Sequence, residues 1–308
     1  MSLRRLMLAA SAVALLLLSS ATPASSQPGS SATHWTVAQS SPAAVRAFWT
    51  PQRLAHVRQA PLPVTAASSV ISPQAEATPV AIPPTRPAGV HPDTSVWITT
   101  GRLVFHNPED GGDYLCTANV VTSNNRDVIA TARHCVMDIS TGAWYQNFQF
   151  APDYNNGSTP YGWWTWRSAG VRVDDTSPGG DNAFVVLATG GNNNQHIQDA
   201  IGGSGIGFNF ALASYAWALG IPGDKNYAVW CQGAPAWSYN GGVHIPDCLG
   251  LNGGASGGPY IVDYNSSDGS AYQTASFFGS WGSGTDGNSY FAYYGNAAEE
   301  IYNGAQNA

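Results

Sequence analysis

Ser256 stands inside a run of glycines, a setting in which a hydroxyl group can become a nucleophile. Gly253 and Gly254 lie on one side of it, and Gly257 and Gly258 lie on the other. A serine hydroxyl attacks well only when a neighbouring base takes its proton and backbone N–H groups stabilise the oxyanion that forms. Glycine permits the close backbone approaches that such a loop needs. A glycine-rich turn between two strands explains the pattern equally well, so residues elsewhere must decide.

A histidine and an aspartate elsewhere in the chain have the chemistry that such a serine needs. His134 follows an apolar run at 127–131, and Asp181 leads directly into the apolar run 183–187. An imidazole can act as the base, and a fixed, partly buried carboxylate can orient it. Asp174 and Asp175 compete with Asp181, but neither leads directly into that apolar strand. The alternatives are a structural histidine and a polar strand cap.

Short strands, rather than long helices, are expected to position these residues. The 34 glycines, 20 prolines and 10% charged residues favour many turns. Apolar runs between Gly, Asn and Asp predict two series of about six strands, separated by a connection at 190–195. The predicted strands are 101–106, 114–121, 127–131, 144–150, 162–173 and 183–188, and then 206–210, 215–220, 227–231, 259–262, 271–281 and 289–294. The pattern predicts an all-β protein with two barrels side by side.

A short helix is expected at the carboxyl-terminal end. Asn296 and Glu299 are three residues apart, which is the spacing of a capping box, and this predicts a helix over 297–303.

The first 26 residues have the pattern of a secretory signal peptide. Arg4 and Arg5 precede the apolar run 6–18, and small residues predict a cut after Ala24 or Ser26. A membrane anchor is the alternative, but spanning a bilayer needs about 20 apolar residues. Export is therefore expected, and export permits disulfides.

Residues 27–92 form a leader rich in Pro, Ala, Ser and Thr, with no sustained apolar period. This composition predicts a disordered linker or pro-segment, with a short helix possible around 43–58, where Val45, Phe48 and Trp49 have near-helical spacing. A folded prodomain is less favoured. Residues 93–308 are the expected folded domain, with the first barrel at about 93–190 and the second at about 200–295.

The charges separate the leader from the folded domain. Only one of the nineteen acidic residues, Glu76, precedes residue 92, whereas half of the twelve basic residues do. The folded domain is therefore acidic, and Lys225 is its only lysine, which argues against a nucleic-acid surface. An acidic turn at 107–113 could hold calcium, but it lacks the spacing of known calcium loops, and a solvated hairpin is favoured.

Four cysteines allow three disulfide pairings, and counting alone does not choose among them. Cys116 lies on the predicted strand before the one that leads to His134 and Cys135. A bridge between Cys116 and Cys135 would hold His134 on a rigid hairpin.

The order His134, Asp181, Ser256 resembles that of the chymotrypsin/trypsin-like serine proteases. Residues 131–135 resemble the family's Thr-Ala-x-His-Cys box, and residues 254–259 resemble its Gly-Asp-Ser-Gly-Gly-Pro box. Ser280, Trp281 and Gly282 resemble the Ser-Trp-Gly segment that lines the substrate channel. Residues 150–154 and 160–162 look like those of secreted actinobacterial trypsin-like peptidases. The resemblance covers about residues 93–303.

The resemblance implies two six-stranded antiparallel barrels with a Ser-His-Asp site between them. His134 would take the proton from Ser256, Asp181 would fix the histidine tautomer, and the N–H groups of Gly254 and Ser256 would form the oxyanion hole. The expected activity is that of a secreted serine endopeptidase, made as a zymogen and acting through an acyl-enzyme on a protein or peptide. No metal or organic cofactor, nucleic acid or membrane partner is expected after signal cleavage, and the enzyme is expected to be a monomer.

Ala255 departs from the family pattern, which usually has Asp immediately before the serine. That aspartate pairs with a new N-terminal amine in the animal enzymes, so this activation switch cannot operate here. Packing must shape the loop instead, helped by a second bridge, Cys231–Cys248, that follows by elimination. Cys248 lies eight residues before the serine, further away than is common in the family.

Two other functions compete with that of a protease. A catalytically weak, protease-like binding module is one, because Ala255 leaves room for it. An esterase is the other, but Ala255 and Gly258 occupy the glycine positions of its Gly-x-Ser-x-Gly elbow, and the triad order does not fit an α/β-hydrolase. Composition alone leaves a cell-wall or structural role open.

The primary substrate pocket is expected to carry no charge. In the resembling family the residue six before the serine lies at the pocket base, and here it is Gly250. Ser280, Trp281, Gly282 and Gly284 would form the walls. None offers a carboxylate, and burying a charge without a partner is costly.

The protease should therefore cut after neutral, apolar or aromatic residues. Gly279 stands where glutamate-specific relatives have histidine, so acidic residues are not expected either. Cleavage-site profiling of a peptide library by the mature protein, with Ser256→Ala as control, checks this. A profile dominated by Arg or Lys would contradict it and point to Asp247, which is close in sequence.

Overall fold

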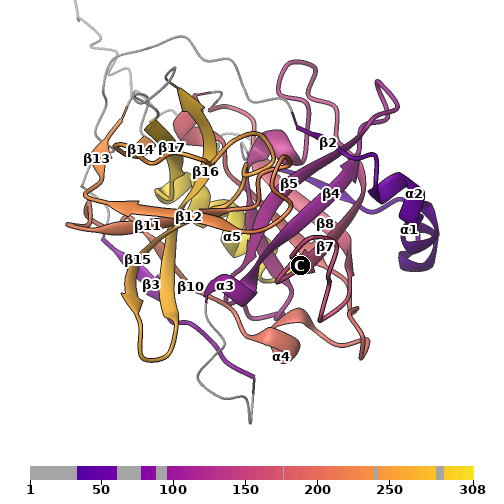
Figure 1. The fold of residues 1–308 in the computed structure, drawn as a ribbon, viewed down its shortest axis with the longest axis horizontal. Helices are drawn as coiled ribbons and strands as arrows, with labels where there is room; N and C mark the ends of the chain where they lie inside the picture. Colours follow the sequence, from indigo (N-terminus) through magenta and orange to yellow (C-terminus); the bar gives the residue numbers. More distant parts are fainter. Residues whose placement is uncertain (1–32, 61–77, 88–95, 176, 239–241, 282–287) are drawn as a thin grey trace, which may run out of the picture. The chain divides into compact units, whose positions relative to one another are not determined.

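Figure 1 shows the computed structural model, which describes residues 33–60, 78–87, 96–175, 177–238, 242–281 and 288–308. The described chain has more β-strand than helix, and its strands are arranged in two sheets. The predicted signal peptide, residues 1–26, lies outside the described residues. Within the described residues, no helix is both long and apolar enough to cross a membrane.

The first sheet closes into a barrel of six antiparallel strands. In spatial order they are β8 (Trp164–Arg172), β7 (Gln146–Pro152), β4 (Thr100–His106), β5 (Asp113–Val120), β6 (Val128–Thr131) and β9 (Ala183–Leu187). The pairing of β9 with β8 completes the ring. A short helix, α3 (Val96–Thr99), leads into β4.

Aromatic side chains fill the interior of this barrel. Phe105, Phe148, Phe150 and Trp164 are at most 1% exposed, and Phe105 stacks on Tyr145 with ring centroids 4.8 Å apart. Alternate residues of a strand face the same side of a sheet, so each strand contributes its apolar face to this core. The packed core makes the barrel a rigid support for the loops at its rim.

The second sheet is a half-barrel. Its strands follow the order β12 (Val229–Gly233), β11 (Ala216–Gly220), β15 (Pro259–Asn265), β16 (Ser270–Trp281), β17 (Asn288–Tyr293), β14 (Gly242–Ile245) and β13 (Ala236–Trp237), with β10 (Gly205–Phe208) beside β16. Within the described part of the chain, no pairing joins β12 to β13. The predicted all-β, chymotrypsin-like fold is confirmed, and the second barrel is open.

Three elements in the described residues after 190 were not predicted from the sequence. They are the helix α4 (Ile197–Ile201) and the strands β13 and β14. These elements have two to five residues each, too few for a hydrophobic period to emerge. Pairing with β17 places β14 in the sheet, and β13 pairs with β14 in turn.

The carboxyl-terminal helix α5 (Asn296–Ala305) is present, but the predicted capping box is wrong. Gly295 is the N-cap, and no side chain caps the helix. Asn296 instead accepts a hydrogen bond from Asn209 through their side chains, at 2.8 Å. The helix is held by its buried face, which includes Ile301 and Tyr302, packed in the same cluster as Phe184 of β9.

The described parts of the leader are ordered on the folded domain, and the prediction of disorder is wrong for them. The leader contributes β1 (Thr33–Val37) beside β8, the helices α1 (Pro42–Phe48) and α2 (Pro51–Leu54), β2 (Arg58–Gln59) beside β5, and β3 (Val80–Ile82) beside β10. A few apolar anchors, Val45 and Trp49 above all, bury themselves against the barrel. The short helix considered around 43–58 is present as α1 and α2, whereas the composition averaged over the segment conceals the order of the leader.

Hydrogen bonds at the start of each leader helix add to this order. The side chain of Ser41 accepts from Ala44 N–H, and the side chain of Thr50 accepts from Arg53 N–H. A proline occupies the first turn of both helices, where its missing N–H costs nothing.

Strand β1 also contacts the end of the chain. Its Trp35 ring lies over Gly170 and Gly304, since a Cβ on Gly304 would come within 2.3 Å of that ring. The Thr33 hydroxyl donates to the Glu300 carboxylate at 3.0 Å. The leader is thus attached to helix α5 as well as to the first barrel.

The structure pairs Cys116 with Cys135 and Cys231 with Cys248, as predicted. The first bridge joins β5 to the segment that follows β6. Replacing Cys116 and Cys135 together by alanine should lower the free energy of unfolding by roughly 2–4 kcal/mol, because the unfolded chain regains freedom. Denaturant titration measures this, and non-reducing peptide mapping that joined Cys116 to Cys248 would refute the pairing.

Candidate active site

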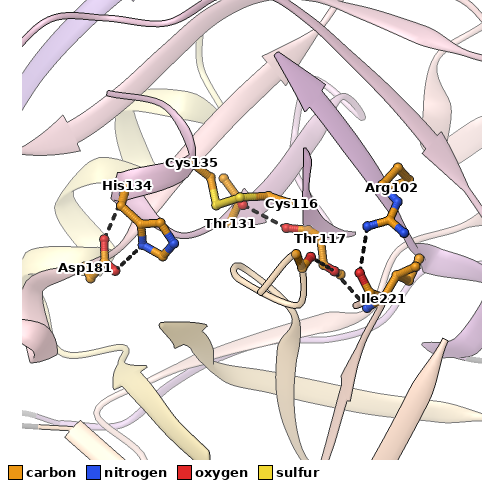
Figure 2. Close-up of a disulfide and its surroundings, with 9 residues drawn as sticks. Arg102, Cys116, Thr117, Thr131, His134, Cys135, Asp181 and Ile221 are labelled. Carbon is orange, nitrogen blue, oxygen red and sulfur yellow. Dashed lines mark hydrogen bonds and ion pairs between the residues drawn. A yellow bond between two sulfur atoms is a disulfide. The ribbon is translucent and has the colours of Figure 1, made fainter. Parts of the chain in front are cut away.

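His134 lies on a short 3-10 helix, η1 (Arg133–Cys135), directly after β6 rather than at the end of a strand. Its neighbour Cys135 is bridged to Cys116 of β5, so two strands of the closed barrel hold this turn (Figure 2). The His134 side chain is 5% exposed. The sequence prediction that a disulfide holds this histidine agrees with the structure.

Asp181, just before β9, holds His134 by two hydrogen bonds (Figure 2). Its Oδ1 accepts from the His134 backbone N–H at 2.9 Å, and its Oδ2 lies 2.6 Å from Nδ1 of the ring. A carboxylate accepts, so Nδ1 carries a proton, and Nε2 of a neutral ring is left as a base. Asp181 therefore fixes the position and the tautomer of His134.

The Asp181 carboxyl group stays ionised despite its burial. Burial alone raises its pKa, but the charge and hydrogen bonds of His134, together with Arg133, outweigh burial and leave the pKa below the usual value. A lowered carboxyl pKa adds stability above the usual aspartate range, and this stability is lost only as the pH falls through the lowered value.

The two competing aspartates do not contact His134. Asp174 forms an ion pair with Arg172, and the backbone carbonyl of Asp175 accepts from Arg133. The structure thus selects Asp181 as the carboxylate that meets the histidine.

Ser256 comes from the second sheet and is brought against the first barrel by its backbone. Its carbonyl accepts from Thr117 N–H of β5 at 2.7 Å, and Gly257 N–H donates to Phe277 at 2.7 Å. A Cβ on Gly257 would lie 2.1 Å from Thr131 Oγ1, and φ there is +83°. Only glycine fits, and this close approach joins the serine loop to the end of β6, just before His134.

Two buried atoms of the site lack hydrogen-bond partners among the described residues: His134 Nε2 and Ser256 Oγ. The hydrogen bond expected between them is therefore absent from this state of the protein. Buried polar atoms are normally paired, and catalytic hydrogen bonds are often long until substrate binds. The two free atoms are a base and a hydroxyl, the pair that nucleophilic catalysis requires.

The backbone N–H groups of Gly254 and Ser256 likewise donate to no acceptor within the described residues. Gly254 has φ of +93°, and a Cβ there would lie 2.6 Å from Gly223 N and from Leu115 Cδ1. Such a position admits only glycine. Two unused N–H groups beside a serine hydroxyl can bind a developing negative oxygen.

Ala255 is fully buried and shows how the loop is held without an aspartate. Its N–H donates to Asn252 O, and its own carbonyl accepts from Gly258 N–H. A Cβ on Gly220 of β11 would lie 2.7 Å from the Ala255 Cβ, so the methyl group fills the available space. Packing shapes this loop where the family pattern has a charge.

Sequence reasoning missed Thr117, which links three segments around the serine loop (Figure 2). Its hydroxyl donates to Gly254 O and accepts from Ile221 N–H, both at 2.9 Å. A threonine in an apolar strand gives no distinguishing signal, because threonine is common in strands.

Sequence reasoning also missed Arg102. It could have been identified because it is the only residue of β4 with a permanent charge. It is 2% exposed, and it donates to the carbonyls of Ile221 and Pro222. Burial lowers its pKa to about 10, partly offset by Tyr154. This arginine ties the loop after β11 to the first barrel (Figure 2).

The predicted pocket residues are described only in part. A Cβ on Gly250 would meet nothing within 4 Å, and φ there is +95°. Ser280 and Trp281 lie on β16 opposite Ser289 and Asn288, whereas Gly282 and Gly284 lie outside the described residues. Asp247 is exposed.

One group of potential metal ligands lies at the site: Cys116, His134 and Cys135 have donor atoms within 4.8 Å of one another. Metal binding by cysteine requires thiolates. Both sulfurs are joined in the disulfide, so these residues do not fit a metal.

Comparison with proteins of known structure identifies the family of this chain. No protein-family model and no curated protein matches the sequence. Among solved structures, the chain is similar to the protease Anisep from Arthrobacter nicotinovorans, with 31% identity, a TM-score of 0.61, and coverage of 70% of this chain and 98% of that one. A thermostable serine protease, AL20, from an extremophilic microorganism has 26% identity and a TM-score of 0.61, covering 69% and 98%.

A Glu endopeptidase solved in complex with MPD shares the fold at 14% identity, with a TM-score of 0.55 and coverage of 73% and 98%. The identity to Anisep extends over nearly the whole of that protein. This chain belongs to the trypsin-like serine protease family.

Replacing Thr117 by valine should slow the reaction of Ser256 with a fluorophosphonate probe about tenfold, because the Gly254 carbonyl and the Ile221 N–H lose their partner and the loop relaxes. Thr117→Ser keeps the hydroxyl and should react within about twofold of the wild type. Labelling rates on purified protein measure this. A valine variant that labels at the wild-type rate would show that Thr117 does not position the loop.

Proposed function

We propose that this protein is a secreted serine endopeptidase that hydrolyses peptide bonds through an acyl-enzyme at Ser256. The observation that carries the proposal is the His134–Asp181 pair with its free Nε2, on a rigid turn joined to the serine loop. The unused N–H groups of Gly254 and Ser256 add to it.

In the first half of the reaction, His134 Nε2 takes the proton of Ser256 Oγ as that oxygen attacks the substrate carbonyl carbon. The negative oxygen then accepts from the N–H groups of Gly254 and Ser256, and Asp181 stabilises the imidazolium. His134 returns the proton to the leaving amine when the peptide bond breaks.

In the second half, water takes the place of the amine. His134 accepts a proton from the water, the new oxygen attacks the acyl carbon, and Ser256 leaves with the proton back on Oγ. Each oxyanion donor contributes about 3–4 kcal/mol to barrier lowering in such sites. Because Asp181 already holds His134 in one orientation, the reaction does not have to lose entropy to orient the ring.

Secretion and synthesis as a zymogen belong to the same proposal. Two disulfides favour an oxidising compartment, and the N-terminal apolar run favours export. The substrate would be a protein or peptide and the working form a monomer, without nucleic acid or membrane. The chemistry of the three side chains needs no metal or organic cofactor.

The nucleophile is tested by Ser256→Ala, which should fold normally and lose covalent labelling by a fluorophosphonate probe. Asp181→Asn should lower kcat about 10⁴-fold, because the amide favours the wrong histidine tautomer. Ser140→Ala, at an exposed serine, is the matched control and should label normally. If the wild-type protein failed to label, the protease-like binding module would replace this proposal.

A further inference from the structure

The leader reaches the serine loop and is not confined to a distant face of the domain. Strand β2 pairs with β5, and Ala60 N–H donates to Leu115 O at 3.2 Å. The next side chain back, Gln59, lies against the loop: a Cβ on Gly253 would meet its Oε1 at 2.3 Å. The leader therefore occupies space directly beside the residues that carry Ser256.

This contact lies on the leaving-group side of the candidate site. His134 must give its proton to the leaving amine, so that part of a substrate lies toward His134. Cys135, next to it, is bridged to Cys116, which follows Leu115 on β5. The residues expected to hold the acyl part, Gly250 and Ser280, belong instead to the segments of the second sheet.

The leader runs in the opposite direction to a leaving peptide. Strands β2 and β5 are parallel, and β5 runs from Leu115 toward Thr117, whose N–H donates to the Ser256 carbonyl. The leader from Arg58 to Ala60 thus runs toward the serine. A leaving peptide begins at the scissile bond and runs away from it, so the leader presents its backbone in reverse.

Apolar anchors fix the leader at a distance from the serine loop. Val45 is fully buried and Trp49 is 5% exposed, and both pack in one cluster with Val104 and Leu115 of the barrel. The Trp49 indole N–H donates to Asn147 O at 2.5 Å.

Opposite charges add to the anchors. Arg53 forms an ion pair with Asp113 at 2.8 Å, and Arg58 lies 3.9 Å from Asp110. The Arg58 guanidinium also stands 4.7 Å from the centre of the Tyr114 ring. The acidic turn predicted as a solvated hairpin thus receives two arginines of the basic leader.

We propose that residues 41–60 are an intramolecular inhibitor that docks in reverse on the leaving-group side of Ser256. This inference rests on the proposed function and specifies how that function is regulated. The docking surface is the acidic turn, the Leu115 edge of β5 and the apolar cluster beneath Trp49, and it fits a segment with two arginines and a tryptophan. Reversed polarity keeps the docked bonds from being cut, because attack needs a carbonyl aligned with Oγ and the oxyanion donors.

A leader docked on the leaving-group side should affect two kinds of substrate differently. A small activated ester needs only the acyl side, Ser256 and the oxyanion donors, so the full chain should turn it over. A peptide with the same acyl residues, extended by several residues beyond the scissile bond, needs the surface that the leader covers. The full chain should hydrolyse this peptide poorly.

Arg53→Glu combined with Arg58→Glu, made in the full chain, tests the docking. The two glutamates face Asp113 and Asp110, so kcat/KM for the extended peptide should rise about tenfold or more, while ester turnover stays within about twofold. Arg46→Glu makes the same charge change at an exposed position of α1 for which the described structure shows no ion pair, and it should alter neither rate. Ester turnover also reports that each variant is folded.

A second variant avoids charge reversal. Gln59→Ala removes the side chain that packs against Gly253, and it should raise peptide hydrolysis without changing ester turnover. About 1 M NaCl should act in the same direction on the wild type, because it shortens the Debye length to about 3 Å.

Three results would overturn the inference. If the wild-type full chain hydrolysed the extended peptide as fast as the double variant, the leader would not be an inhibitor. Ester and peptide rates rising together would show that the leader covers the whole site. Mass spectrometry that found cleavage by the protein itself between Arg58 and Ala60 would disprove the reversed direction. Absence of ester turnover in every form would instead refute the proposed function, and the inference with it.

Discussion

The site depends on one close approach between two backbones. Gly257 lies so near to Thr117 and Thr131 that a single methyl group would collide with both, and the Ser256 carbonyl accepts from Thr117 N–H in the same place. These contacts cross from the second sheet to the first, whose rim carries His134. The serine and the histidine belong to different sheets, and this contact sets how far apart they lie. Everything that stiffens β5 and β6, including the Cys116–Cys135 bridge, therefore also fixes the spacing of the site.

Hydrogen bonds to backbone groups and side-chain packing, in place of an ion pair, hold the serine loop. Thr117 bridges Gly254 and Ile221, and Arg102 donates to the carbonyls of Ile221 and Pro222. Ala255 fills the space beside Gly220. A loop held by a buried ion pair depends on the protonation of that pair, whereas hydrogen bonds to backbone groups persist over a wide pH range. This domain has its loop in place while the leader is still attached, so the inhibition proposed for the leader would act by covering the site and not by deforming the loop.

The sequence was sufficient for the parts of the structure that follow from local pattern. Apolar runs between turn residues predicted most strands, and the residues around His134 and Asp181 predicted that these two side chains meet. The hydrogen bond expected between His134 and Ser256 is absent. The sequence was insufficient where contacts between distant segments determine an element or the role of a residue. Thr117 looks like any strand threonine, β14 is too short to show a period, and Asn296 bonds to Asn209 rather than capping its own helix. The leader was predicted only in part: the spacing of Val45, Phe48 and Trp49 indicated a short helix, but the barrel that orders these residues is not represented in the composition.

The contact of Trp35 with Gly304 joins residues that lie far apart in the sequence. Synthesis proceeds from the amino terminus, so this contact cannot form until the segment that contains Gly304 has left the ribosome. Strand β1 is synthesised before both sheets, so it cannot make this contact until they have been synthesised. Contacts of such long sequence separation also form slowly. If the leader is removed, as synthesis as a zymogen would require, the same contact is lost. A domain that loses contacts of this kind after folding cannot use them to refold, so the lifetime of a form without the leader would be set by how slowly it unfolds.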